Sequence, residues 1–521
     1  MLQVKSVTRL VAACVAAGAW LTVPTTLVPL RAQPAAGAPS TWCNPLPIPD
    51  YPIGRLVRGI DVGSPVDPSH LWLVDRAAQY RELADPTALW HEGAWYLYPS
   101  VDMAWVSRDA GATWTHHPLN VRDIGYAPTV VKHRGRFLLM ASDSDLYASA
   151  SPLGPFERLG RIGLPARGGW PSLIDPALFS DEDGRLYYYW GNSPSAGLWG
   201  VELDAEDPTR IKGTPIELLR FQSEQHRWER VGDYNQNPHI GWVEGAWVLR
   251  IGSRYYLTYG AAGTENRTYA MGAYVSDSPL GPFTPQRRNP FMRNVHGLLT
   301  GTAHGSISRG PGGHLWAFYT LRATVTHGFE RRLGMDRVEV DADGELFVRQ
   351  ATSTPQWLPG REPAGATTAD TGWLPLNVGV QTVASSTTPQ APARQTVDED
   401  LRTWWEPATG DTQPTVTSRL STRSTVRAVR LAWRDVGLDT RRGVVPGPFR
   451  YRIEGETAPG KWQVLLDRSA STTDLLIDYR ELPATSVTRV RVVVVGAPKG
   501  ITPGIAQFTV FGLADPLPPR Q

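Results

Sequence analysis

Three carboxylic acids and one histidine occupy corresponding places in the sequence, at or beside the first residue of a recurring stretch. They are Asp85, Asp175, Glu244 and His304. If the fold brings these stretches together, the carboxyl groups share one pocket, and at least one acquires a raised pKa because neighbouring carboxylates ionise at a high cost. A protonated carboxyl near neutral pH is a general acid, and an ionised neighbour is a general base. Glycoside hydrolysis uses this pair: the acid protonates the leaving oxygen while the base activates water.

Each of these acids also has a purely structural interpretation. Asp-Pro pairs such as Asp85-Pro86 and Asp175-Pro176 commonly begin turns. Glu244 lies between Trp242 and Trp247 in a strand-like run, where an unpaired carboxylate is costly, so that a structural and a functional role fit it equally. The recurrence of acids at equivalent places favours function for the three together.

The recurring stretches share one plan, which is a short apolar strand, a turn with glycine and an aromatic strand. They begin at Asp85, Ala127, Asp175, Glu244 and Ala303. The hexapeptides Ser151–Phe156 and Ser278–Phe283 are identical, which indicates two copies of one substructure. Such antiparallel repeats predict a β-propeller with five blades. The first strand of each blade lines the channel, so the four ionisable residues and Tyr126 of the second blade are expected to converge at one end of the axis.

The chain is predicted to be all-β, with two folded parts. Residues 39–353 form the propeller. Residues 354–372 are rich in proline, glycine and threonine and are predicted to be a linker. Residues 373–513 hold strand-like runs separated by turns, which predict a β-sandwich, and residues 514–521 follow as a tail.

Residues 1–38 have the pattern of a secretory signal peptide, in which two basic residues precede an apolar run and the small residues Ala35–Ala38 follow. We therefore expect a secreted or periplasmic protein. An uncleaved anchor is an alternative, and Val11–Cys14 resembles a lipoprotein box. The sequence has no second apolar run long enough to span a bilayer, so no integral membrane domain is expected after cleavage. Cys43 is then the only cysteine, which excludes an intrachain disulfide.

The charge balance argues against nucleic acid as a partner. The 521 residues include 52 basic and 50 acidic ones, for a net charge of +2, and no tract of lysine and arginine stands out. Turn formers and aromatic residues dominate the composition, with 50 Gly, 45 Pro, 20 Trp and 18 Tyr. A neutral oligosaccharide or polysaccharide fits this composition better, and we expect a monomer.

The ordered motifs over Cys43–Val348 resemble glycoside hydrolase family 43 and its relatives. The resemblance implies that Asp85 is the general base, that Glu244 is the general acid, and that Asp175 orients the acid and adjusts its pKa. It also implies an exo-acting, inverting enzyme that releases sugars of the arabinose, xylose or galactose type.

Two further segments carry the resemblance. Tyr126–Pro128 is similar to the family's Trp-Ala-Pro, and Gly301–Gly305 to its Gly-x-Gly-His segment. The resemblance implies that His304 lies on the axis and can ligate a structural Ca²⁺, while the reaction itself requires no cofactor. Ala246 and Ala303 stand where the family has proline and glycine, and Tyr126 replaces tryptophan, so the backbone geometry at the acid and the subgroup stay open.

Five residues are expected to contact the substrate. Tyr126 and His304 belong to the motifs above, and Arg322 lies where family members often place a substrate-contacting arginine. Trp105 and Trp190 are expected to stack on a sugar face. The alternatives are an arginine on a surface strand and tryptophans that fill the gaps between blades.

The C-terminal module resembles the discoidin (coagulation factor 5/8 type C) superfamily, which includes carbohydrate-binding module family 32. The matching pieces are Val397–Trp405 and Phe508–Gly512. Such modules bind sugars or lipid head groups, and this one has the alternative role of bracing the propeller. Trp404 and Trp405 are candidates for sugar contact or for packing.

Two other functions stay open. Ser107–Trp114 fits the Asp-box turn of sialidase-type propellers, but it occurs once, and no arginine cluster or Tyr-Glu pair can be assigned to accompany it. A non-catalytic glycan-binding protein is the other alternative. The intact set of Asp85, Asp175 and Glu244 argues against it.

Overall fold

The computed structural model describes residues 38–53, 79–100, 102–121, 124–164, 173–193 and 196–515. All but the last residue of the predicted signal peptide, and the last six residues of the predicted tail, lie outside the described residues. The described elements are strands and short 3₁₀ turns, which confirms the all-β prediction. Among the residues that the structure describes, none of the helical turns has the length and apolar character that crossing a membrane requires.

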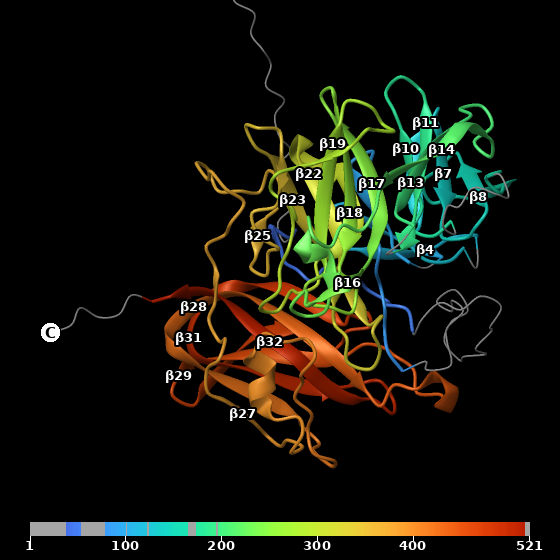
Figure 1. Cartoon of the computed structure of the whole chain (residues 1–521). Coiled ribbons are helices and arrows are strands. Elements are labelled where there is room, and N and C mark those ends of the chain that lie inside the picture. The colour runs from blue at the N-terminus through green and yellow to red at the C-terminus, as the bar shows by residue number, and fades with distance from the viewer. Residues whose placement is uncertain are drawn as a thin grey trace, which may run out of the picture. The chain divides into compact units, whose positions relative to one another are not determined.

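Five antiparallel sheets follow one another along the chain and form the predicted five blades, coloured from cyan to yellow in Figure 1. Blade one holds β2 (Thr87–His91), β3 (Ala94–Tyr98), β4 (Met103–Ser107) and β5 (Thr115–Pro118). Blade two holds β6 (Thr129–His133), β7 (Arg136–Met140), β8 (Leu146–Ser149) and β9 (Glu157–Gly160). Blade three holds β10 (Ala177–Ser180), β11 (Leu186–Trp190), β13 (Leu198–Leu203) and β14 (Ile211–Leu219). Blade four holds β12 (Asn192–Ser193), β17 (Val243–Ile251), β18 (Arg254–Ala261), β19 (Ala270–Ser276) and β20 (Thr284–Pro285). Blade five holds β21 (Ala303–Arg309), β22 (Leu315–Arg322), β23 (Arg331–Val340) and β24 (Leu346–Phe347).

Tight turns set the register of the first hairpin in a blade. Glu92-Gly93 joins β2 to β3, Arg134-Gly135 joins β6 to β7, and all four residues have positive φ. Two consecutive residues of positive φ make a type I′ turn, whose twist matches that of the flanking strands. The second strand of the hairpin is then fully buried in blades one and three, where its aromatic residues pack between neighbouring sheets.

The first strands of the blades surround the axis. β2, β6, β10, β17 and β21 pack against one another in this cyclic order, and β21 closes the ring on β2. A residue with left-handed backbone lies just before the start of each of these strands or among its first three residues. The five are Asp85 (φ 51°), Ala127 (φ 49°), Asp175 (φ 52°), Gly245 (φ 62°) and His304 (φ 45°).

This conformation is costly for residues other than glycine, by about 1–3 kcal/mol each, and persists where the surroundings hold it. Hydroxyl groups of the preceding blade provide this support, because each accepts a hydrogen bond from the N–H of a left-handed residue. Thr320 Oγ1 accepts from Asp85, Ser100 Oγ from Ala127 and Ser142 Oγ from Asp175, at 2.8, 3.1 and 3.0 Å. The side chains at the starts of these blades are thereby aimed at the axis.

The C-terminal part of the chain forms one seven-stranded antiparallel sheet, coloured orange to red in Figure 1. Its strands are β26 (Leu374–Pro375), β27 (Thr382–Ala384), β28 (Thr415–Val436), β29 (Arg450–Ala458), β30 (Lys461–Asp467), β31 (Ile477–Gly496) and β32 (Thr502–Ala514). The pairing of β28 with β31 and β32 is interrupted by register shifts, which let strands of such length bend. Alternate residues of β28, β31 and β32 face an apolar core, as the predicted β-sandwich requires.

Several other predicted features lie in or near this part. Within the predicted linker, β25 (Gln356–Trp357) pairs with β1 (Thr41–Trp42). Trp405 is fully buried and donates its Nε1 hydrogen to Ser386 O, and the guanidinium of Arg434 covers the ring of Trp404, so both tryptophans pack.

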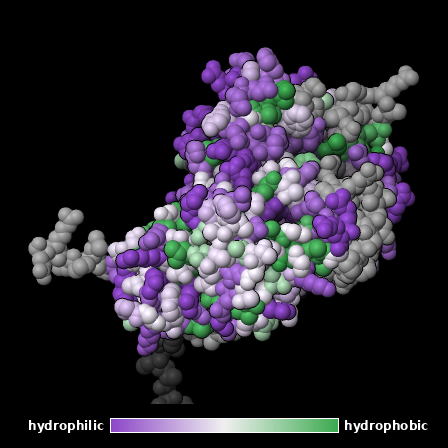
Figure 2. Space-filling view, turned by 90° about the horizontal axis from the view of Figure 1, so that it is seen from below, coloured by the Kyte–Doolittle hydropathy of each residue, from purple (hydrophilic) through white to green (hydrophobic). Residues whose placement is uncertain are grey.

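On the face shown in Figure 2, hydrophobic residues lie in small separate groups among hydrophilic ones. This distribution is typical of a surface exposed to water.

Candidate active site

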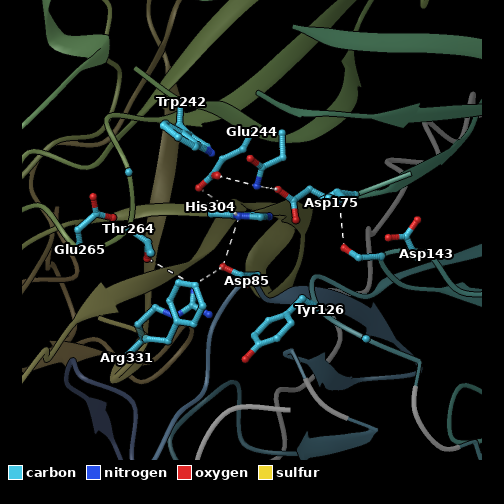
Figure 3. A pocket seen from close by; sticks show the side chains of 16 residues that line it. Asp85, Tyr126, Asp143, Asp175, Trp242, Glu244, Thr264, Glu265, His304 and Arg331 are labelled. Carbon is cyan, nitrogen blue, oxygen red and sulfur yellow. Dashed lines mark hydrogen bonds and ion pairs between the residues drawn. The ribbon is translucent and has the colours of Figure 1, made fainter. Parts of the chain in front are cut away.

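A cavity of about 620 Å³ lies where the starts of the five blades meet. Its lining includes Asp85 of blade one, Tyr126 of blade two, Asp175 of blade three, Glu244 of blade four and His304 of blade five. The structure therefore brings together five of the eight residues predicted for the site, and Figure 3 shows the three carboxyl groups arranged around the His304 ring.

Asp85 is held by cationic and hydroxyl groups. Arg331 Nη1 donates to its Oδ1 at 3.1 Å, and Ser100 Oγ donates to its Oδ2 at 2.7 Å. Burial raises the pKa of Asp85, but Arg331, His304 and the hydrogen bonds from Ser100 and Thr320 outweigh it, so that the pKa lies below the usual range. Asp85 is therefore ionised at neutral pH.

Glu244 and Asp175 have the opposite environment. Asn192 Nδ2 donates to Glu244 Oε2 and to Asp175 Oδ2, each at 3.0 Å, and the hydroxyl of Tyr269 donates to Glu244 Oε1. Burial and the neighbouring Asp175 carboxylate raise the pKa of Glu244 to about 7. Burial likewise raises the pKa of Asp175, to about 6. Two buried acids that share one amide donor resist full ionisation, which keeps a proton on Glu244 near neutral pH.

His304 lies between the acids. Its Nδ1 is 3.3 Å from Asp85 Oδ1 and 3.9 Å from Glu244 Oε1, so these two oxygens are at most about 7 Å apart. Burial lowers the pKa of His304, but the nearby carboxylates of Asp85, Asp175 and Glu244 together outweigh burial. The pKa of His304 therefore lies above its usual value. Gly245 packs against the ring, because a Cβ there would lie 2.4 Å from His304 Cδ2. A side chain at this position would displace the imidazole from the axis.

The surroundings of His304 bear on the predicted Ca²⁺ site. Among the described residues, no three His, Cys, Asp or Glu side chains form a group that could hold a metal ion. His304 Nδ1 faces the carboxyl oxygens of Asp85 and Glu244. A Ca²⁺ ion ligated by His304, which the family resemblance implies, stays a prediction.

Arg331 links the carboxylates to the aromatic wall of the cavity. Its second nitrogen donates to Glu82, whose other carboxyl oxygen accepts a hydrogen bond from the Tyr126 hydroxyl at 3.4 Å. The guanidinium carbon lies 4.9 Å from the centroid of the Phe329 ring and 5.9 Å from that of Tyr126. These contacts fix the cation that faces Asp85 from the cavity wall.

Comparison with known proteins shows which family the propeller resembles. Residues 103–346 match the family model described as glycosyl hydrolases family 43. The propeller is similar to the glycosidases of family 43 over this range. The chain is 26% identical over 307 residues to the β-D-galactofuranosidase xynD of Aspergillus niger, covering 51% of this chain and 81% of that protein. It is 26% identical over 247 residues to a β-xylosidase of Xylanibacter ruminicola, covering 42% and 71%. A solved thermostable family-43 glycoside hydrolase aligns with 53% of this chain and 96% of its own, at 25% identity and a TM-score of 0.45.

Three predicted substrate contacts of the glycosidase domain need correction. Trp105 and Trp190 are fully buried outside the cavity; Trp105 donates to Pro49 O, and Trp190 stacks on Tyr188 with centroids 4.9 Å apart. Both fill space in and between blades, which was the alternative interpretation. Arg322 Nη1 donates to Asp233 Oδ1 at 2.9 Å, and Arg322 lines a smaller cavity beside the C-terminal part. The arginine that reaches the active-site cavity is Arg331.

Other residues of the site had not been predicted from the sequence. They are Asn192, Trp242, Tyr269, Phe329 and Arg331. A signal for Asn192 exists, because a polar residue stands two positions after the buried second strand at Ser100, Ser142 and Asn192 alike. The other four lie in segments without a repeated pattern.

The Asp-box turn lies away from the site. The Asp109 carboxylate accepts hydrogen bonds from Ser107 Oγ and from the Thr113 N–H and hydroxyl, which closes the turn between β4 and β5. None of these residues lines the active-site cavity. The motif is therefore a structural turn here.

Proposed function

We propose that the protein is an exo-acting glycosidase that hydrolyses terminal glycosyl residues of the arabinose, xylose or galactose type with inversion of configuration. Asp85 is the general base, Glu244 the general acid and Asp175 the residue that keeps Glu244 protonated. The observation that carries the proposal is the contrast between two carboxyl groups in one cavity: Arg331 and Ser100 donate hydrogen bonds to Asp85, whereas Glu244 is buried and shares the Asn192 amide with Asp175. These surroundings lower the pKa of Asp85 and raise that of Glu244 to about 7. Such a divergence supports Asp85 as the base and Glu244 as the acid.

The steps follow from the contacts. Protonated Glu244 donates its proton to the glycosidic oxygen as the bond to the anomeric carbon breaks. Ionised Asp85, oriented by Ser100 and Arg331, accepts a proton from the water molecule that attacks the same carbon from the opposite side. The nearest measured oxygens of Asp85 and Glu244 are at most about 7 Å apart, an upper limit that overlaps only the lower end of the ~6.5–9.5 Å separation in inverting enzymes, so inversion is proposed from the family resemblance. Each step uses protein side chains and water, so the proposed reaction needs no cofactor.

Exo action is proposed from the family resemblance. Residues from all five blades line the cavity. Tyr126, Trp242 and Phe329 supply aromatic faces for sugar stacking. The names of the relatives, a β-D-galactofuranosidase and a β-xylosidase, support sugars of these classes.

The N-terminal sequence supports export, and we propose that the enzyme acts as a monomer outside the cytoplasm on oligosaccharides or polysaccharides. Determination of the mature N-terminus tests cleavage after the signal. A retained N-terminus would instead favour an anchor.

Product analysis tests the function. Wild type and Glu244→Gln are incubated with arabinan, arabinoxylan, galactofuranose-containing glycans and aryl glycosides, and the products are separated by chromatography. Release of a single monosaccharide by wild type alone supports the proposal, and proton NMR of the first-formed anomer tests inversion. Release of oligosaccharides would contradict exo action, and glycan binding without any product would favour a non-catalytic glycan-binding protein.

A further inference from the structure

Two consecutive residues of β28, in the C-terminal sandwich, contact two segments of the propeller. Arg434 Nη1 donates to the buried carboxylate of Glu330. The next residue, Asp435, accepts a hydrogen bond from Arg81 Nε at 2.8 Å. Because successive side chains of a strand point to opposite faces, this adjacent pair reaches two different partners.

The direct neighbours of those two partners meet at the active site. Arg331 follows Glu330 in the chain, and Glu82 follows Arg81. Arg331 Nη2 donates to Glu82 Oε1, while Arg331 Nη1 donates to Asp85 Oδ1 at 3.1 Å. One residue of each propeller pair thus contacts the sandwich, and the next belongs to the Arg331–Glu82 ion pair beside Asp85.

Both propeller segments are anchored through these contacts. The Glu330 carboxylate accepts the N–H groups of Val325 and Thr326 at 2.9 Å, and Arg434 Nη2 donates to the Thr326 hydroxyl at 2.6 Å. Glu330 thus closes the loop that carries Phe329 and Arg331 to the cavity. A buried carboxylate without its cation is costly, so loss of Arg434 is expected to loosen this loop.

The side chain of Arg81 is also held by several hydrogen bonds. Its side chain is 2% exposed, and its nitrogens donate to Asp435 and to Asp474 of the sandwich, the latter at 2.7 Å. It also donates to Tyr51 O at 2.9 Å. Arg332 Nη1 donates to Arg81 O at 2.9 Å, which ties the segment of Arg81 to the start of β23.

We propose that Arg434 and Asp435 of the C-terminal sandwich are positioning residues for catalysis, which hold Arg331 and Glu82 so that Arg331 faces the general base Asp85. This inference rests on the proposed function of Asp85. It assigns the sandwich a role in the catalytic site that requires no glycan bound to the sandwich itself.

The first test compares pH profiles of kcat/KM for Arg434→Met, Arg331→Met and the control Arg489→Met. Arg489 pairs with Glu456 within the same sandwich, so its replacement removes the same charge without a contact to the propeller. The assay uses whichever p-nitrophenyl arabinofuranoside, xyloside or galactofuranoside the wild type cleaves best. Asp85→Asn is measured in parallel.

The acidic limb of the profile reports ionisation of Asp85, which Arg331, His304, Asp175 and Glu244 surround. Loss of the Arg331 charge is expected to move this limb upward by about 1–3 pH units. Arg434→Met is expected to move it upward by about half a unit and to lower kcat/KM about 10- to 100-fold, through misplacement of the cation. In the Arg331→Met background, Arg434→Met should cause no further shift.

The outcomes separate this inference from the proposed function. If Asp85→Asn is inactive while the profile of Arg434→Met coincides with that of Arg489→Met, the positioning role is wrong and the catalytic assignment stands. If Asp85→Asn retains activity, the proposed function is wrong. An additive shift in the double variant would show that Arg434 does not act through Arg331.

Hydrogen exchange gives a readout that needs no substrate. In Arg434→Met, backbone amides over 322–332 and over 81–85 are expected to exchange faster than in wild type, whereas Arg489→Met leaves both segments unchanged. Faster exchange confined to 322–332 would overturn the link to Glu82. If Arg434→Met fails to fold, Arg434→Lys, which keeps the charge but loses the two-nitrogen contact, is expected to show the same pattern at smaller amplitude.

Discussion

Replacement of Tyr269 by phenylalanine tests how the pKa of the proposed acid is set. The fully buried Tyr269 hydroxyl donates to Glu244 Oε1. A hydrogen bond to a charged group contributes about 1.5–3 kcal/mol, of which a bond to the protonated carboxyl retains about 1 kcal/mol. The difference favours the ionised form of Glu244 by about 0.5–2 kcal/mol, and 1.36 kcal/mol corresponds to one pKa unit.

Tyr269→Phe is therefore expected to raise the pKa of Glu244 from about 7 by about one unit. Because the acid must be protonated, the basic limb of the kcat/KM profile should move to higher pH by the same amount. The control is Tyr255→Phe. The Tyr255 hydroxyl, in β18 of blade four, donates to Asp181 Oδ2 at 2.6 Å, so this variant removes a buried hydroxyl that does not contact Glu244. An unchanged basic limb in Tyr269→Phe, or a move to lower pH, would refute the reasoning.

Three further predictions concern the site and the blade that carries the acid. Asp175→Asn removes the carboxylate that raises the pKa of Glu244, so the basic limb of kcat/KM should move to lower pH; a move upward would contradict the proposed role of Asp175. Gly245→Ala places a Cβ against the His304 ring at a φ of 62°, and we expect a loss of unfolding free energy of at least about 1 kcal/mol and a fall in kcat, measured by denaturant unfolding and initial rates; wild-type values for both would contradict the contact. Burial raises the pKa of Glu229 from 4.5 to about 7, so the folded state binds a proton that the unfolded state has lost, and the free energy of unfolding should fall by up to about 3 kcal/mol as pH rises through this interval. Glu229→Gln should then raise Tm more at pH 8 than at pH 5, and equal changes at both pH values would count against a buried ionisable Glu229.

The parts of the fold that repeat could be predicted from the sequence. Hairpins with the same strand-turn-strand plan place Asp85, Asp175 and His304 at equivalent backbone positions, where left-handed φ values of 45–52° aim them at the axis. Glu244 and Tyr126 each stand one residue before such a position. The sequence signal for these five residues is therefore the blade repeat itself.

The parts of the site that could not be predicted depend on contacts between segments that are distant in the sequence. Arg331 and Arg322 are both arginines at the end of a strand in blade five, and only the packing of the loop between them decides which one reaches the cavity. Trp105 and Trp190 belong to aromatic strands of which no residue lines the cavity, and only the packing of the blades decides this placement. The role of Arg434 could not be predicted, because its partner Glu330 is 104 residues away in the other folded part.

The central claim is that Asp85 is the general base and Glu244 the general acid. Glycosides with different leaving groups test this claim most directly. A dinitrophenolate leaves without protonation, whereas a sugar or an unsubstituted phenol needs an acid. We expect Glu244→Gln to lose about 10²–10⁴-fold in kcat on the poor leaving groups and little on the dinitrophenyl glycoside, and Asp85→Asn to lose activity on both. Equal losses on both substrates in Glu244→Gln, or full activity of Asp85→Asn on either, would contradict the assignment of acid and base.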